Sequence, residues 1–238
     1  MSVKSYPLSV LIHMISMITY GYSICWQFLH VLPPGSERYG RLKYLTYWNL
    51  WIQFITFTVS LVADFISNPN NNSRNKNRPP TTITVRDTLF NSLALPLAIF
   101  VSISFWGLYA IDRQLIFPVG IEKWYPNWLN HCTHTIILPI VLLDNYLVCH
   151  TRRSKKTELS LLFAVIIGYG VWVLFMGLTS DVWVYPILTK LNWPLRASFM
   201  LSSCLVITSF YYFGVFLYDM SWKSSAAKHK IETRNKLK

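Results

Sequence analysis

Long stretches without a charged residue recur along the chain, and each is about as long as a membrane is thick. No charge lies between Lys4 and Glu37, and 20 uncharged residues separate Lys43 from Asp64. The later stretches hold 24, 20, 22 and 22 uncharged residues. Twenty residues of α-helix rise ~30 Å, which is the thickness of the hydrocarbon core of a bilayer. The pattern therefore predicts transmembrane helices.

Six helices of this kind are predicted, because an open strand would leave its backbone groups unpaired in lipid and the runs are too long for barrel strands. Their ranges are residues 8–29, 44–64, 88–111, 127–147, 159–179 and 197–218. Pro96 and Pro139 fall inside spans, where membrane helices tolerate proline, and we expect them only to kink the helices. The predicted fold class is all-α, a bundle of six transmembrane helices forming one integral membrane domain over 1–238.

The composition agrees with this interpretation and excludes other classes. Hydrophobic residues make up 53% of the chain and aromatic residues 16%, while only 13% are charged. A soluble domain carries charge on about a quarter of its positions. The sequence thus excludes a disordered chain and does not fit an ordinary soluble globule.

The lysines and arginines predict the orientation of the bundle. In the six-helix arrangement, fifteen of the 22 basic residues lie on the side that holds both termini, including the tail at 219–238, and seven lie on the other side. The positive-inside rule then places both termini in the cytosol. Basic cytosolic loops beside anionic lipid account for the net charge of +12, so we expect no nucleic-acid partner. The sequence does not distinguish the endoplasmic reticulum from the plasma membrane.

Histidines inside the predicted spans are the first candidates for chemistry, because an ionisable group in lipid is costly. His13 has no polar neighbour that the sequence identifies. His131 and His134 lie three residues apart, so they can share a helix face. A metal site is one interpretation of that pair, but zinc needs three or four ligands and no Glu lies near the pair in its span. We therefore expect no metal and no cofactor.

A neutral imidazole can instead act as a general base for a hydroxyl group. The hydroxyl must lie at the same membrane depth on a neighbouring helix. The second and fourth spans both start from the non-cytosolic side, so Thr46 and His134 share a leaflet. Other hydroxyls are comparably placed: Thr133, Thr135, Thr179 and Ser180. Because most hydroxyls in spans bond to their own helix, spacing alone leaves the nucleophile open.

Five segments of the chain, in order and with matching spacing between about residues 38 and 218, resemble one known family. They are residues 42–46 (LKYLT), 85–87 (VRD), 112–118 (DRQLIFP), 128–135 (WLNHCTHT) and 183–186 (WVYP). The family is the androgen-induced/androgen-dependent TFPI-regulating family of multi-pass membrane threonine hydrolases. The NHxxHT and WVYP strings are the most specific of these matches.

The resemblance implies an enzyme that hydrolyses fatty acid esters of hydroxy fatty acids drawn from the bilayer. It places the nucleophile at Thr46 and the histidine base at His134, with an acyl-threonine intermediate. The donors that stabilise the oxyanion are not part of the motif. Asn130 and Lys43 are the candidates. Each also has an alternative role: Asn130 can form a hydrogen bond at the start of the helix, and Lys43 can act as a snorkelling anchor at the membrane surface. His131 is expected to cap the helix rather than to orient His134.

A non-enzymatic protein is the alternative. In a lipid carrier or a regulatory membrane protein, Thr46 and His134 would form a structural hydrogen bond between helices, a contact that is common in membrane bundles. The sequence identifies no protein partner. An esterase and a carrier therefore both remain open, and the resemblance favours the esterase.

Overall fold

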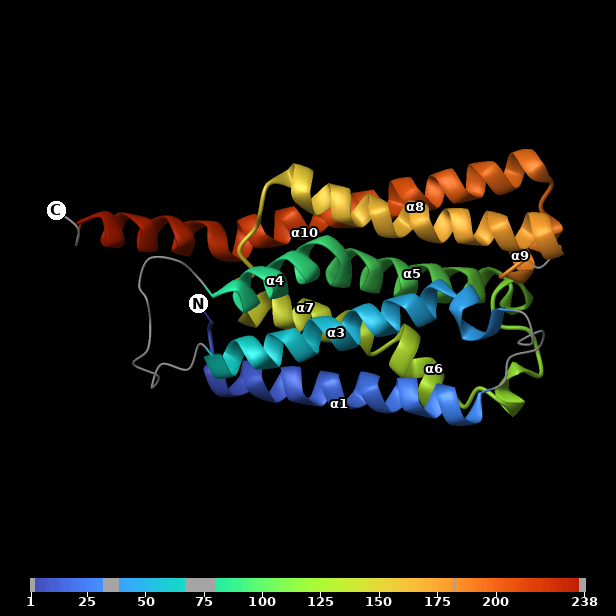
Figure 1. Cartoon of the computed structure of the whole chain (residues 1–238), viewed down its shortest axis with the longest axis horizontal. Coiled ribbons are helices and arrows are strands. Elements are labelled where there is room, and N and C mark those ends of the chain that lie inside the picture. Colours follow the sequence, from blue (N-terminus) through green and yellow to red (C-terminus); the bar gives the residue numbers. More distant parts are fainter. Residues whose placement is uncertain (1–2, 32–38, 67–79, 182, 236–238) are drawn as a thin grey trace.

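The computed structural model describes residues 3–31, 39–66, 80–181 and 183–235, with side chains up to Lys223. Helices are the regular elements of these ranges, and one isolated bridge joins Val3 to Val148. The long helices run side by side along one axis (Figure 1). In chain order the α-helices are α1 (Tyr6–His30), α3 (Leu45–Ile66), α4 (Thr81–Leu89), α5 (Leu95–Ile111), α6 (Asn127–His134), α7 (Ile137–Leu147), α8 (Lys155–Ser180), α9 (Pro186–Lys190) and α10 (Trp193–Asn235).

Five helical stretches are long and apolar enough to cross a membrane. They are Tyr6–His30, Leu45–Ile66, Thr81–Ile111, Lys155–Ser180 and Trp193–Lys223. Each contains one of the predicted spans or overlaps nearly all of it. Large apolar side chains on their outer surfaces are exposed, whereas many polar side chains are buried between the helices. This distribution suits a protein surrounded by lipid rather than by water. Together with the five long helices, it confirms the prediction of an all-helical, multi-pass membrane protein.

The fourth predicted span is not one helix. It is divided into α6 and α7, which meet at Thr135 and Ile136. Pro139 explains the break, because proline has no N–H for the carbonyl of Thr135 and its ring crowds that carbonyl. The expectation that Pro139 only kinks the span was therefore wrong. As a result His134 is the last residue of α6 and lies at an interruption inside the bundle.

The third span accommodates its proline differently. A π-helical turn, Phe90–Ala94, joins α4 to α5 directly before Pro96. The Gln53 side chain on α3 donates to the carbonyl of Ala94 at 2.8 Å. Because a neighbouring helix satisfies a carbonyl of this turn, α4 and α5 continue as one membrane-length stretch.

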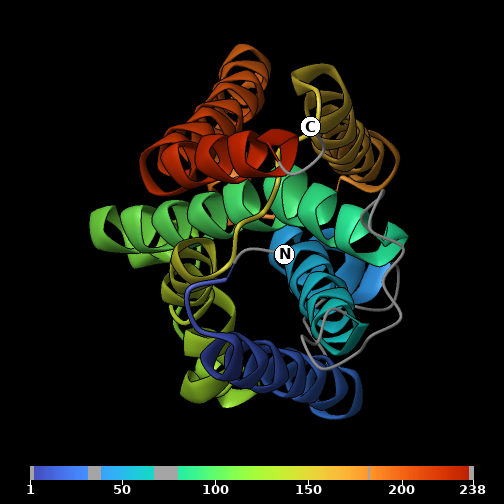
Figure 2. The same ribbon diagram turned by 90° about the vertical axis from the view of Figure 1, so that its left-hand side faces the viewer.

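The stretch formed by α4 and α5 runs through the middle of the bundle. Figure 2 shows it between α8 and α10 on one side and α1, α3, α6 and α7 on the other. α5 contacts α3, α6, α7 and α10. The start of α1 and the far end of α10 lie at the same end of the bundle (Figure 1). The start of α3 lies at the opposite end, where the short α9 and the loop between α5 and α6 also gather.

A buried polar network joins three helices at the end where α1 begins. His13 on α1 lies between two carboxylates, with Nδ1 2.6 Å from Asp64 on α3 and Nε2 2.8 Å from Asp144 on α7. His150 extends the network, since its Nε2 lies 2.9 Å from the other oxygen of Asp144. All four side chains are buried. His13, which has no identifiable partner in the sequence, thus links α1, α3 and α7.

We expect Asp144→Asn to destabilise the protein by about 3 kcal/mol, because it removes the shared charged partner of two buried imidazoles. Asp219→Asn is the matched control, since Asp219 forms an exposed pair with Lys223 at 3.2 Å. Its cost should stay below about 1 kcal/mol. Thermal unfolding of the purified protein in detergent measures both values. Equal stability of the two variants would contradict a stabilising role for the network.

Candidate functional site

Thr46 and His134 lie in direct contact at the end of the bundle opposite to the polar network. Thr46 Oγ1 is 3.2 Å from His134 Nε2. Thr46 stands in the first turn of α3, and His134 ends α6 at the break made by Pro139. Thr46 is half-buried and His134 is buried. The structure therefore brings together the two residues that the sequence placed in one leaflet.

Two tyrosines fix the start of α3 and with it the position of Thr46. The N–H of Leu45 contacts the hydroxyl of Tyr169 on α8 at 3.0 Å and that of Tyr185, just before α9, at 3.1 Å. Tyr169 in turn donates to the carbonyl of Lys43 at 2.9 Å. These bonds satisfy backbone groups that a helix start leaves unpaired. They also anchor the threonine against α8.

Asn130 sets the tautomer of His134. The Nδ1 atom of His134 lies 2.8 Å from the side-chain oxygen of Asn130 and 3.1 Å from its backbone oxygen, one helical turn earlier. Both oxygens are acceptors, so Nδ1 carries the proton and Nε2 presents its lone pair to Thr46. In this arrangement the hydroxyl of Thr46 donates to His134. The network, and not an observed hydrogen, assigns this tautomer.

The structure gives Asn130, one of the two candidates for the oxyanion donor, a contact with His134 instead. Its oxygen contacts Nδ1, on the opposite side of the imidazole from the nitrogen that contacts Thr46. The side chain therefore orients His134 and does not reach the hydroxyl of Thr46. Phe105 on α5 adds a second constraint, since its ring stacks on the imidazole with centroids 3.7 Å apart and planes at 13°.

His131 lies outside this arrangement. Its side chain is exposed, its Nδ1 is 3.0 Å from the hydroxyl of Thr135, and its ring stacks on Trp106. The expectation that it caps the start of the helix was wrong, because α6 starts at Asn127 and His131 lies in its middle. The two histidines of the span thus occupy different surroundings. Among the described residues, no group of three or more His, Cys, Asp or Glu side chains is arranged to hold a metal ion.

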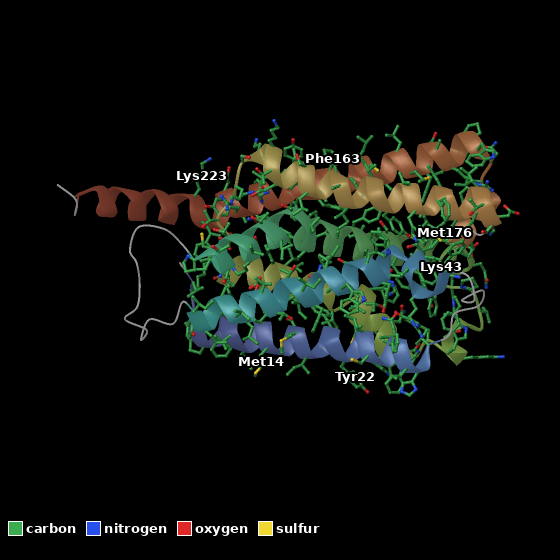
Figure 3. The ribbon with its side chains drawn as sticks, viewed as in Figure 1. Met14, Tyr22, Lys43, Phe163, Met176 and Lys223 are labelled. Atoms are coloured by element: carbon green, nitrogen blue, oxygen red, sulfur yellow. The ribbon has the colours of Figure 1, made fainter. Side chains whose placement is uncertain are left out.

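Lys43 is buried and not a snorkelling anchor, which corrects one of its two expected roles. It is 5% exposed, and its ammonium lies 5.3 Å from the centroid of the Tyr44 ring. Burial lowers the pKa of Lys43. Figure 3 shows Lys43 at the end of the bundle away from Lys223. Lys43 is near Thr46 in sequence, but it is absent from the residues that line the two cavities described next.

Two cavities meet at Thr46. The first, of about 410 Å³, is lined by Thr46, His134, Gln27 of α1 and Arg41, together with many apolar and aromatic side chains. The second, of about 400 Å³, lies between α5, α8 and α10 and is lined mainly by apolar side chains. Thr46, Phe105, Ile116 and Tyr185 line both. Each volume lies in the ~300–1,000 Å³ range of sites for small molecules.

Comparison with known proteins shows to which family the chain is related. Residues 8–219 match the family described as FAR-17a/AIG1-like protein. The chain belongs to the FAR-17a/AIG1-like family. The human androgen-induced gene 1 protein is 28% identical over 219 residues, which cover 90% of this chain and 92% of that protein. The human androgen-dependent TFPI-regulating protein is 36% identical over 192 residues, which cover 81% of this chain and 82% of that protein.

The resemblance found in the sequence motifs is therefore confirmed for this member of the FAR-17a/AIG1-like family. A rat androgen-dependent TFPI-regulating protein is likewise 36% identical, over 185 residues that cover 77% of this chain and 78% of that protein. No solved structure matches the chain. The match over residues 8–219 includes Thr46, Asn130 and His134.

Sequence reasoning named Asn130 but missed its contact with His134, although the sequence held a signal for it. Asn130 precedes His134 by four residues, and residues four apart are neighbours on a helix surface. A polar side chain one turn before a candidate base could thus have been identified as its orienting partner. Tyr169 and Tyr185 offered no such signal, because they approach Leu45 from more than a hundred positions away in the chain.

Proposed function

We propose that this protein is a membrane-embedded esterase that hydrolyses fatty acid esters of hydroxy fatty acids through an acyl-threonine intermediate. The contact between Thr46 Oγ1 and Nε2 of His134 is the observation that carries the proposal, and the bonds of Nδ1 to Asn130 assign the lone pair to Nε2. A hydroxyl, an imidazole and an orienting acceptor form the arrangement that activates serine, threonine and cysteine nucleophiles. No cofactor is required, because the side chains present supply both nucleophile and base.

The reaction proceeds in two steps. His134 accepts the proton of Thr46 while Oγ1 bonds to the ester carbonyl carbon, and the carbon–oxygen bond to the alcohol then breaks. The alcohol oxygen leaves with the proton from His134 as a hydroxy fatty acid. Water then attacks the acyl-threonine, gives a proton to His134, and releases the fatty acid. That proton returns to Oγ1 of Thr46 and restores the enzyme.

Tyr185 is the oxyanion donor that the geometry favours over Asn130 and Lys43. It lines both cavities beside Thr46, and its oxygen accepts from the N–H of Leu45. Because an oxygen that accepts still has its own proton to donate, the phenol can serve the developing negative charge. Burial raises the pKa of Tyr185, which keeps the phenol protonated.

Six passes with both termini in the cytosol are part of the proposal. α6 and α7 together supply the sixth pass beside the five long stretches, and the start of α1 and the end of α10 lie at one end of the bundle. The excess of basic residues on that side supports a cytosolic location. The membrane is that of the endoplasmic reticulum or the cell surface, and the site lies in its non-cytosolic leaflet.

We expect Asn71, in the sequon Asn71-Asn72-Ser73, to remain without glycan, because this orientation keeps its loop away from the glycosyltransferases. The sequon lies outside the described residues. Mass spectrometry of the protein from mammalian membranes, with and without glycosidase, measures its state. A glycan on Asn71 would invert the topology and move the site to the cytosolic leaflet.

Labelling with a fluorophosphonate probe distinguishes an esterase from a lipid carrier. An activated hydroxyl reacts with such a probe, whereas a hydroxyl in a structural hydrogen bond does not. We expect labelling of the wild type, and loss of labelling in Thr46→Ala and His134→Ala. A folded wild type that stays unlabelled and hydrolyses no lipid ester would favour the carrier.

A further inference from the structure

The first cavity carries an unusual set of unpaired groups. Three buried nitrogen atoms of its lining residues have no hydrogen-bond partner among the described residues: Gln27 Nε2, Arg41 Nε and Trp183 Nε1. Each is an N–H donor. The other buried side-chain atoms without a partner belong to residues that line neither cavity. Unpaired donors are costly in a folded protein, so three on one cavity wall call for an acceptor that the described residues do not supply.

The charge on this wall is positive and is not neutralised by the groups that Arg41 contacts. The guanidinium donates through Nη2 to the backbone carbonyls of Phe28, at 3.1 Å, and Val31, both at the end of α1. Carbonyl oxygens satisfy N–H groups but carry no full charge. No carboxylate of the described ranges forms an ion pair with Arg41. A ligand with a negative charge and acceptor oxygens would complete the wall, as a carboxylate does.

The donors come from separate elements that converge on one cavity. Gln27 lies near the end of α1, Arg41 in the 3₁₀ helix Gly40–Lys43, and Trp183 between α8 and α9. Gln27 is 5% exposed and Trp183 is 9% exposed. Gly177 on α8 makes room for the indole, since a Cβ there would come within 2.6 Å of it. The wall is therefore built into the fold.

We propose that Gln27, Arg41 and Trp183 form a carboxylate subsite that binds the free carboxyl group of the hydroxy fatty acid portion of the substrate. This assignment rests on the proposed esterase function. It divides the substrate between the two cavities, with the hydroxy fatty acid in the first and the acyl chain in the apolar second cavity.

The position of His134 supports the same division independently. His134 lines the first cavity and not the second. As the general acid, it must reach the alcohol oxygen of the leaving group, which belongs to the hydroxy fatty acid. Thr46 lines both cavities, as the nucleophile must if it attacks the bond that joins the two chains. The first cavity, the more polar of the two, thus receives the product that carries both a hydroxyl and a carboxylate.

Hydrolysis of two matched substrates by the full-length protein in detergent tests the subsite. One is a branched ester of a long-chain hydroxy fatty acid with a free carboxyl group, and the other is its primary amide, which has no charge. We expect wild type to prefer the acid by about tenfold or more in kcat/KM. Arg41→Gln should lower kcat/KM for the acid far more than for the amide and so remove this preference. Lys190→Gln, which removes an exposed charge at the same end of the bundle, should keep the preference.

Two further variants decide the matter if Arg41→Gln does not fold. Gln27→Glu adds a negative charge to the wall and should lower the acid rate while it spares the amide. Trp183→Phe removes the N–H, keeps an aromatic ring, and should lower the preference in part. An equal rate for acid and amide in wild type, or an unchanged preference in Arg41→Gln and Gln27→Glu, would overturn the subsite and leave the esterase proposal intact.

Binding of the product separates this inference from the reaction itself. A hydroxy fatty acid should displace a fluorescent fatty acid from wild type, and its affinity should fall by about tenfold in Arg41→Gln. If no ester is hydrolysed but this difference in binding is found, the esterase proposal fails and the subsite holds. If the two proteins bind the hydroxy fatty acid equally, the subsite is wrong whether or not hydrolysis occurs.

Discussion

Thr46→Val should abolish hydrolysis of branched fatty acid esters, with a loss on the order of 10³-fold or more, while the protein remains folded. Valine keeps the branched shape of threonine and lacks only the hydroxyl. The hydroxyl makes the contact with Nε2 of His134, and Thr46 lies at the junction of the two cavities. Removing it therefore removes the nucleophile and leaves both cavities in place. Hydrolysis of a purified branched ester, followed by mass spectrometry, measures the loss.

Two companion variants sharpen this test. Thr46→Ser retains a hydroxyl at the same place and should keep part of the activity. Thr58→Val is the matched control, because Thr58 lies on the same helix about 18 Å from Thr46. Its hydroxyl bonds to the carbonyl of Phe54. This variant should hydrolyse like wild type. Full activity in Thr46→Val would end the acyl-threonine mechanism, whatever the family relationship.

The helices were predictable because a charge in lipid is costly, and membrane-spanning stretches of the sequence therefore lack charged residues. The uncharged stretch between Lys43 and Asp64 became α3, which runs from Leu45 to Ile66. The same reasoning placed Thr46 and His134 in one leaflet, since depth in a membrane follows from distance along the chain, whereas the choice of Thr46 among several hydroxyls came from the family resemblance. Membrane depth is thus an unusually strong constraint on which side chains can meet.

The interruption of the fourth span was not predictable from hydropathy. Hydropathy treats residues 127–147 as one run, and a proline in a membrane helix is often accommodated, as Pro96 is by the π-helical turn before it. At Pro139 the chain instead divides into α6 and α7. Whether a proline bends or divides a helix depends on neighbouring elements that can satisfy its freed carbonyl. This information is absent from local sequence.

The partners of His13 show the same limit. Asp64 and Asp144 lie 51 and 131 positions away in the chain, and each ends one of the uncharged stretches. Interpreted as span ends, these carboxylates would face water. They are buried instead, because a carboxylate within a bundle can pair with an imidazole from a neighbouring helix. Pairing of this kind depends on helix packing, which charge spacing does not report.

His134→Ala should reduce hydrolysis by about 10²–10⁴-fold, whereas His131→Ala should cost less than about threefold. The structure gives the reason for the difference. His134 is buried, its Nδ1 contacts Asn130, and its Nε2 lies 3.2 Å from the hydroxyl of Thr46. His131 is exposed and contacts Thr135 and Trp106, away from both cavities. Asn130→Ala should fall between the two, because the backbone oxygen of residue 130 still accepts from Nδ1.

Two additional measurements distinguish a base from a metal ligand or a structural residue. Added imidazole should restore part of the rate of His134→Ala, since Thr46 and the space left by the ring remain available to a small base. It should not restore Thr46→Val, which lacks the group to be deprotonated. A metal site predicts a different pattern, in which His131→Ala and His134→Ala are equally damaging and a chelator inactivates wild type. That pattern would contradict the assignment of His134 as the general base, because a base needs only its proton donor and its orienting partner, and no metal.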